Sequence, residues 1–236
     1  MTRATHICFT TVLELETRCR DALLRGEACD STLNEQIDDA TRVARIAVSD
    51  ACSEGALTDV GYFGFADASA DLSNACVTQA QGAVAATYAP ALPAMASETA
   101  AECMTATAAY GAKVMRYALE RQTPVFERLA SRLFEEDEKS EQVLQMRIEL
   151  RETRQRWIAG LTQACPQFAD IYGRSAESYL RTLGQRTDCV LSKTYVNDAV
   201  SCITQQCGNG IREDPEKCDD GNADDGDGCR NDCTTP

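Results

Sequence analysis

Histidine is nearly missing from this chain of 236 residues, which contains only His6. Hydrolases built on a Ser-His-Asp or Cys-His arrangement, or on a histidine-bound zinc ion, need at least one well-placed imidazole. His6 lies close to the start of the chain, in a segment that we expect to be disordered. The haem attachment motif C-x-x-C-H and the glycine-rich patterns of nucleotide-binding loops are also absent. The sequence therefore predicts a protein without enzymatic activity, haem or nucleotide.

Aromatic residues and long apolar runs are scarce as well, and the 23 basic residues are outnumbered by 37 acidic ones. Aromatic side chains make up 6% of the chain, and alanine is abundant over residues 83–109, which favours closely packed helices over a β-sandwich. No run of about 18 apolar residues occurs, so we expect no membrane span. The formal net charge of −14 disfavours nucleic acids as partners, because affinity for phosphate groups depends on clustered lysine and arginine residues.

The fold that we predict is mainly α. The apolar fraction of 44% suffices for a packed core, and apolar residues recur every three or four positions, as they do on one face of a helix. The expected architecture is a disulfide-stapled bundle of five or six helices, followed by a small irregular cysteine-rich module. Helices are expected over residues 8–25, 31–52, 67–88, 97–121, 124–160 and 166–193, with a short one over 197–204.

Local signals place the ends of these helices. The glycine-containing stretch from Leu57 to Phe65 indicates a loop, and it holds the aromatic pair Tyr62 and Phe63, either exposed as a contact patch or packed onto the bundle. Proline at the first helical position loses no hydrogen bond, so Thr123-Pro124 favours a helix start. The charged stretch from Glu135 to Glu141 is expected to project into solvent or to turn.

Cysteine, in contrast, is abundant, with thirteen residues. Glutathione and thioredoxin would keep so many thiols reduced in the cytosol, so the count predicts disulfides and an extracellular, cell-surface or periplasmic location. Residues 1–10 lack the basic and apolar regions of a secretory signal, and we expect that a signal has been removed ahead of Met1. The body cysteines expected in disulfides are Cys19, Cys29, Cys52, Cys76, Cys103, Cys165, Cys189 and Cys202.

The odd number of cysteines leaves at least one thiol unpaired or bonded to another chain. We assign this role to Cys8, because a frayed chain terminus holds it least. Several body cysteines lie near predicted helix ends, where a staple can join neighbouring helices. Cys52–Cys76 and Cys165–Cys202 are compatible pairings, although the sequence leaves the connectivity open.

The composition changes at about residue 206, which divides the chain into a helical domain, 1–206, and an acidic cysteine-rich module, 207–236. The module contains nine acidic and three basic residues, a net charge of −6. Its 30 residues offer hardly any apolar side chain beyond Ile211, so crosslinks or a metal must order it. The cysteines available for this are Cys207, Cys218, Cys229 and Cys233.

The module contains several cysteine and glycine motifs in a fixed order. A CGNG opening at Cys207 to Gly210 is followed by Glu216, by CDDGN at Cys218 to Asn222, by GDGC at Gly226 to Cys229, and by the closing Cys233. This segment resembles the myxococcus-type cysteine-rich repeat. The resemblance implies a small disulfide module of secreted and surface proteins, often bacterial, and similar in style to Notch-like repeats, which fold around calcium.

The acidic loop of the module itself predicts calcium, because crowded carboxylates repel one another unless a cation lies among them. Oxygen ligands on a glycine-rich loop favour calcium over zinc or copper. The loop is not an EF-hand, because Asp225 stands where glycine is required and Asn231 where the bidentate glutamate belongs. A solvated acidic turn without metal is the alternative, and the cysteine spacing disfavours zinc. The calcium ligands that we predict are Asp219, Asp220, Asn222, Asp224, Asp225 and Asp227.

Trp157, the only tryptophan, follows Arg151, Arg154 and Arg156. These residues indicate either a cationic face or simple core packing of the indole ring. The function that we expect is that of a secreted or cell-surface, non-enzymatic interaction or structural protein, binding other envelope or extracellular proteins or itself. The alternatives are a subunit of an extracellular filament or envelope complex and, with least support, an enzyme without a recognisable motif.

Overall fold

Helices make up all the regular structure in the part of the chain that the computed structural model describes, which is residues 1–59, 61–88, 97–130, 136–192, 217–218 and 230. The mainly α prediction is therefore confirmed. The elements are α1 (Thr2–Leu24), α2 (Leu33–Ala51), α3 (Glu54–Asp59), α4 (Phe65–Ser73), the π-helical segment η1 (Asn74–Thr78), α5 (Gln79–Thr87), α6 (Glu98–Ala130), α7 (Glu136–Ala164), α8 (Phe168–Tyr172) and α9 (Ala176–Ser192).

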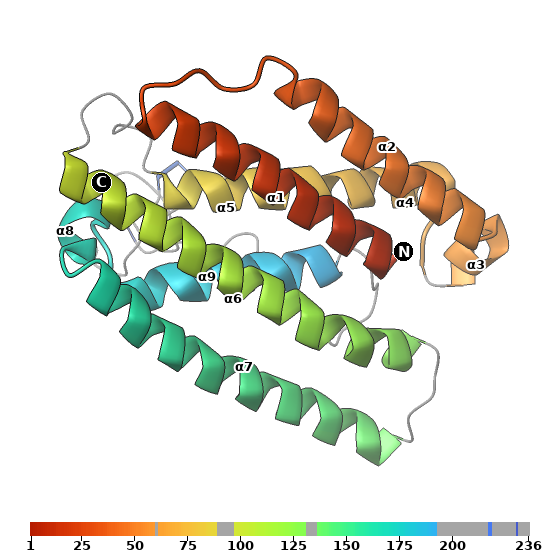
Figure 1. Ribbon diagram of the computed structural model, residues 1–236. Helices are drawn as coiled ribbons and strands as arrows, with labels where there is room; N and C mark the ends of the chain where they lie inside the picture. Colours follow the sequence, from red (N-terminus) through yellow and green to blue (C-terminus); the bar gives the residue numbers. More distant parts are fainter. Residues whose placement is uncertain (60, 89–96, 131–135, 193–216, 219–229, 231–236) are drawn as a thin grey trace.

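Four helices, α1, α5, α6 and α9, pack against one another at the centre of the bundle (Figure 1). The helix α2 covers the outer side of α1, and α7 lies on the opposite side, against α6 and α9. None of the helices in the described ranges is long and apolar enough to cross a membrane. The architecture is a bundle with one flanking helix on either side.

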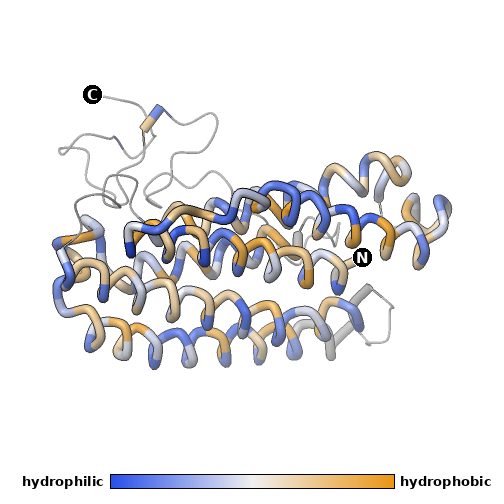
Figure 2. The backbone as a smooth tube through the Cα atoms, turned by 45° about the horizontal axis from the view of Figure 1, so that its top comes forward, coloured by the Kyte–Doolittle hydropathy of each residue, from blue (hydrophilic) through white to orange (hydrophobic). Residues whose placement is uncertain are grey.

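The helices bury one face each because their apolar residues follow the helical repeat. In α2 the buried positions are Ile37, Thr41, Ala44 and Val48, spaced by three or four residues. Figure 2 shows hydrophilic and hydrophobic stretches alternating along the same helices. This pattern is what an amphipathic helix needs to pack on a core while its other face stays in water.

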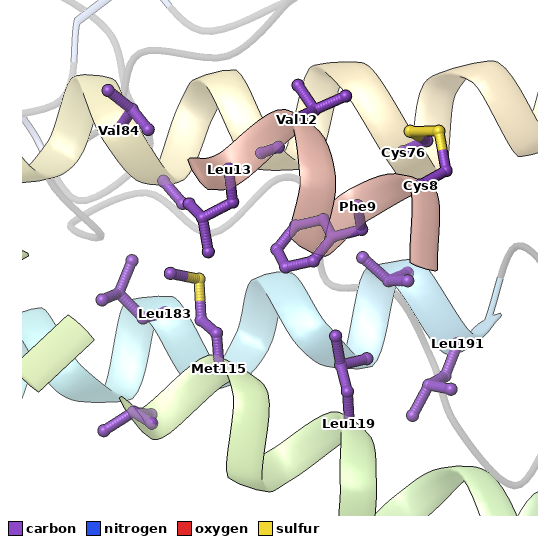
Figure 3. Packing of buried hydrophobic residues seen from close by; sticks show 14 of the residues in the cluster. Cys8, Phe9, Val12, Leu13, Cys76, Val84, Met115, Leu119, Leu183 and Leu191 are labelled. Carbon is purple, nitrogen blue, oxygen red and sulfur yellow. A yellow bond between two sulfur atoms is a disulfide. The ribbon is translucent and has the colours of Figure 1, made fainter. Parts of the chain in front are cut away.

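The core joins residues that are far apart in the sequence (Figure 3). Phe9 and Leu13 of α1 lie toward Met115 and Leu119 of α6 and toward Leu183 of α9, and all five side chains are buried. Burial of a large aliphatic or aromatic side chain stabilises the fold by about 2 kcal/mol. The contacts among α1, α6 and α9 therefore stabilise the centre of the bundle.

A buried hydroxyl network crosses the same core. The Tyr179 hydroxyl on α9 lies 2.7 Å from the Thr87 hydroxyl on α5, and Tyr172 donates to the Thr87 carbonyl at 2.7 Å. Gly111 on α6 makes room for Tyr179, because a Cβ atom there would lie 2.6 Å from the phenol oxygen. Glycine costs about 1 kcal/mol in a helix, and here it permits the close approach of α6 and α9.

The predicted helix start at Thr123-Pro124 is wrong, because α6 continues through Pro124 to Ala130. Proline inside a helix costs about 3 kcal/mol. Burial of the nearby Phe126, which is 0% exposed, offsets part of this cost. The second long helix, α7, instead begins at Glu136, within the charged stretch where we expected the chain to project or turn.

Other predicted boundaries fail for local reasons. The expected loop from Leu57 to Phe65 contains the end of the short helix α3, which buries Leu57. The predicted helix from 166 to 193 is divided into α8 and α9, because Gly173 adopts a left-handed φ of 66° that ends α8. The predicted helix over 197–204 lies outside the described residues.

Candidate binding site

Three disulfides join described cysteines of the helical body. Their pairs are Cys8–Cys76, Cys19–Cys29 and Cys103–Cys165, with Cα atoms 5.5, 4.7 and 4.9 Å apart, within the range that a disulfide spans. Cys189 and Cys218 are disulfide-bonded as well. The disulfides link α1 to η1, α1 to the loop that follows it, and α6 to the end of α7.

The assignment of Cys8 as the unpaired cysteine is wrong, because Cys8 bonds Cys76 (Figure 3). The terminus around it is not frayed: α1 begins at Thr2 and buries Cys8 against η1, and His6 belongs to the same helix. The suggested pairings Cys52–Cys76 and Cys165–Cys202 are also wrong, since Cys165 bonds Cys103. Among the described cysteines, Cys52 at the end of α2 is free and half-buried.

The predicted calcium ligands, Asp219 to Asp227, lie outside the described residues, as do Cys202, Cys207, Cys229, Cys233 and the domain boundary at 206. Within the described ranges no group of three or more histidine, cysteine and acidic side chains is placed to hold a metal ion. The calcium module therefore stays a prediction from the sequence.

The loop that holds Tyr62 and Phe63 divides its two aromatic rings between core and solvent. Tyr62 is 2% exposed and Phe63 is 97% exposed. Both interpretations of this loop are thus partly right. A shallow apolar groove lies nearby on α2 and α4, lined by Ile46, Phe65 and Leu72.

A pocket that the sequence did not predict lies between α6, α7 and α9, the three helices at the lower side of Figure 1. Its cavity measures about 390 Å³. Each helix contributes residues at helical spacing, so one face of each helix lines the cavity. The lining residues are Val114, Tyr117, Ala118 and Gln122 from α6, Met146, Arg147, Leu150, Arg151, Arg154 and Trp157 from α7, and Gly184, Thr187 and Asp188 from α9.

The charge of this pocket is opposite to that of the whole chain. Arg147, Arg151 and Arg154 follow one another along α7, and Asp188 is the acidic side chain among the lining residues. The pocket thus carries a net charge of about +2 in a chain whose formal charge is −14. Such a reversal concentrates anions at the site.

Arg154 is half-buried, and its guanidinium group lies beside Gly184 of α9. A Cβ atom at position 184 would lie 3.3 Å from its Nη2 atom, so the glycine provides room for the guanidinium. Burial lowers the pKa of Arg154 and the nearby Asp188 carboxylate raises it. Arginine keeps its proton at neutral pH in either case, so a permanent positive charge lies at the pocket wall.

Asp188 faces the arginines across the pocket. Its carboxylate accepts a hydrogen bond from the Gln122 amide at 3.1 Å. Burial raises the pKa of Asp188, whereas this hydrogen bond and the positive charges of Arg154 and Arg147 lower it in part. The net shift is upward, which means that the pocket partly resists a negative charge at this position.

The aromatic part of the pocket consists of Tyr117 and Trp157. Their rings pack edge to face, with centroids 5.3 Å apart, and the Tyr117 hydroxyl accepts a hydrogen bond from Thr153 at 3.4 Å. Trp157 therefore lies neither wholly in the core nor on an open cationic face: it lines the pocket together with Arg151 and Arg154. Arg156 instead donates to the Thr153 hydroxyl at 2.9 Å and does not line the cavity.

These residues are suited to binding. Each arginine has a planar guanidinium group with several N–H donors, whose arrangement matches the oxygen atoms of carboxylate and phosphate groups. The described residues that line the pocket combine these guanidinium donors with apolar and aromatic side chains.

In comparisons with known proteins, the chain matches no family model, no curated protein and no solved structure. The likeness of residues 207–233 to a cysteine-rich repeat therefore stays a prediction from their motifs.

Proposed function

We propose that this chain is a secreted or cell-surface, non-enzymatic interaction protein of an oxidising compartment. Its disulfide-stapled bundle is the recognition body, and its C-terminal module binds calcium through the acidic loop between Cys218 and Cys229. The partners are other envelope or extracellular proteins.

The observation that carries this proposal is the set of three disulfides within the helical body. Four of their cysteines, Cys8, Cys76, Cys103 and Cys165, are at most 2% exposed. A buried disulfide that joins separate helices is part of the folded structure, unlike the exposed pairs that cycle in redox enzymes. A protein built this way is suited to a compartment without a strong thiol reductant.

The calcium module rests on the composition of residues 207–236, which combines the CGNG, CDDGN and GDGC motifs with a net charge of −6. Calcium among the carboxylates would relieve their mutual repulsion and order a segment with almost no apolar core.

Hydrogen exchange tests the calcium proposal. We expect added calcium to slow amide exchange over residues 207–233 and EGTA to reverse the effect, because the metal orders the loop. Replacing Asp224 and Asp227 with asparagine is expected to weaken the calcium response. Asp214→Asn is the matched control, since it removes an acidic residue from the same module outside the loop and leaves the response intact. Exchange that is identical with calcium and with EGTA contradicts the proposal.

A further inference from the structure

The pocket between α6, α7 and α9 has no part in the function proposed above, and its lining suggests a ligand of its own. We propose that it binds a small amphipathic anion, whose carboxylate or phosphate head meets the α7 arginines and whose apolar or aromatic body lies against Tyr117 and Trp157. This inference is independent of the compartment and of the calcium module.

The head of the ligand is assigned by charge. Arg147, Arg151 and Arg154 recur every three or four residues, so their side chains share the face of α7 that lines the cavity. An oxyanion that enters the pocket can take up two or more charge-assisted hydrogen bonds, which are about twice as strong as neutral ones. A neutral or cationic ligand would gain no ion pair with these guanidinium groups.

The body of the ligand is assigned by the apolar lining. Val114, Ala118, Met146 and Leu150 line the cavity together with the edge-to-face pair of Tyr117 and Trp157. Rings at this angle offer both an edge and a face to a bound aromatic group. A wholly polar anion such as inorganic sulfate would leave this surface in contact with water.

The size of the cavity limits the ligand to a small molecule. Its volume of about 390 Å³ lies near the lower end of ligand pockets, which span about 300 to 1,000 Å³. Asp188 limits the charge as well, because its carboxylate repels a second negative group on the ligand. The pocket therefore favours a ligand with a single anionic group and one ring or a short branched chain over a larger polyanion.

The only tryptophan of the chain, Trp157, lines the pocket and reports on it directly. We would titrate the full chain with hydrocinnamate, hydrocinnamyl phosphate and neutral hydrocinnamyl alcohol, following tryptophan fluorescence and calorimetry. We expect at least one of the two anions to bind at least tenfold more tightly than the alcohol, and the tighter anion identifies the head group. Binding of the alcohol as tight as that of both anions, or no binding of either anion, overturns the proposal.

Variants separate this site from unspecific binding. Arg154→Gln is expected to lower the affinity about tenfold, because a charge-assisted hydrogen bond is lost. Asp188→Asn is expected to raise the affinity, because a repelling charge is removed while the amide oxygen still accepts from Gln122. Arg116→Gln is the matched control: it removes the same charge from α6, where the exposed Arg116 pairs with Glu14 of α1 outside the cavity, and leaves the affinity unchanged.

Circular dichroism and the melting temperature establish that each variant is folded. If Arg154→Gln does not fold, Arg151→Gln replaces it, because that side chain is exposed and its loss leaves the core intact. Equal losses of affinity in the pocket variant and in Arg116→Gln would contradict a specific site and would indicate general attraction to arginine.

Discussion

At the scale of single residues, His6 shows how burial changes a titratable group. It lies in α1 near Arg116 and Glu120 of α6, and burial lowers its pKa, with a smaller lowering from Arg116 and an opposing effect of Glu120. The Arg116 guanidinium also donates to Glu14 at 2.7 Å, which keeps its positive charge near α1. The imidazole of His6 therefore resists protonation in the folded state.

This resistance predicts how stability depends on pH. The unfolded chain binds a proton at His6 below the ordinary value of 6.5, while the folded chain does so only at lower pH, so the free energy of unfolding falls as pH decreases through this window. We expect the decrease between about pH 7 and about pH 5.5 to be smaller in His6→Gln. Urea unfolding measures the slope, and the NMR titration of His6 measures its pKa directly. Equal slopes, or a pKa of His6 at or above 6.5, contradict the prediction.

At the scale of helices, the disulfides differ in the length of chain that they close. The cysteines of Cys103–Cys165 are 62 residues apart in sequence, and those of Cys19–Cys29 are 10 apart. A longer closed loop removes more entropy from the unfolded chain. The first pair is also buried, whereas Cys19 and Cys29 are half-buried.

We therefore expect Cys103→Ala/Cys165→Ala to lower the free energy of unfolding by about 4 kcal/mol, and Cys19→Ala/Cys29→Ala to lower it by about 3 kcal/mol. Chemical denaturation of the two double variants beside the wild-type chain measures both values. Each variant removes two sulfur atoms, so one serves as the control for the other. A larger loss for the Cys19–Cys29 variant would mean that loop closure does not decide their contributions.

The helices could be predicted where the signal is local. A serine cap illustrates this: Ser97 accepts a hydrogen bond from the Ala100 amide at 3.2 Å, and α6 begins at Glu98, close to the predicted start. The continuation of α6 through Pro124 could not be predicted, because it depends on the burial of Phe126 among other helices. The disulfide pairing could not be predicted either, because it also depends on how helices pack. Cys8 and Cys76, for example, are 68 residues apart in the sequence.

The pocket was only partly visible in the sequence. Trp157 and its neighbouring arginines indicated a special face of one helix, and two of these arginines do line the cavity with it. Gly184 and Asp188 carried no such signal, because their role depends on the packing of α9 against α7. Residues of one helix face are predictable from spacing, whereas a site shared by three helices requires their arrangement.

At the scale of the whole molecule, a chain with a net charge of −14 contains a bundle with buried disulfides and a common core. Like charges repel one another across such a surface and oppose the folded state. Crosslinks that restrict the unfolded chain offset this repulsion. We infer that these disulfides form in an oxidising compartment and stay oxidised in the working protein.

Thiol trapping in the cells that make the protein tests this inference. Free thiols would be blocked with N-ethylmaleimide before lysis, and the protein would then be digested without reductant and mapped by mass spectrometry. We predict linked peptides for Cys8–Cys76, Cys19–Cys29 and Cys103–Cys165, with Cys52 carrying the maleimide. Maleimide on the cysteines of these three pairs in the native protein would contradict the account.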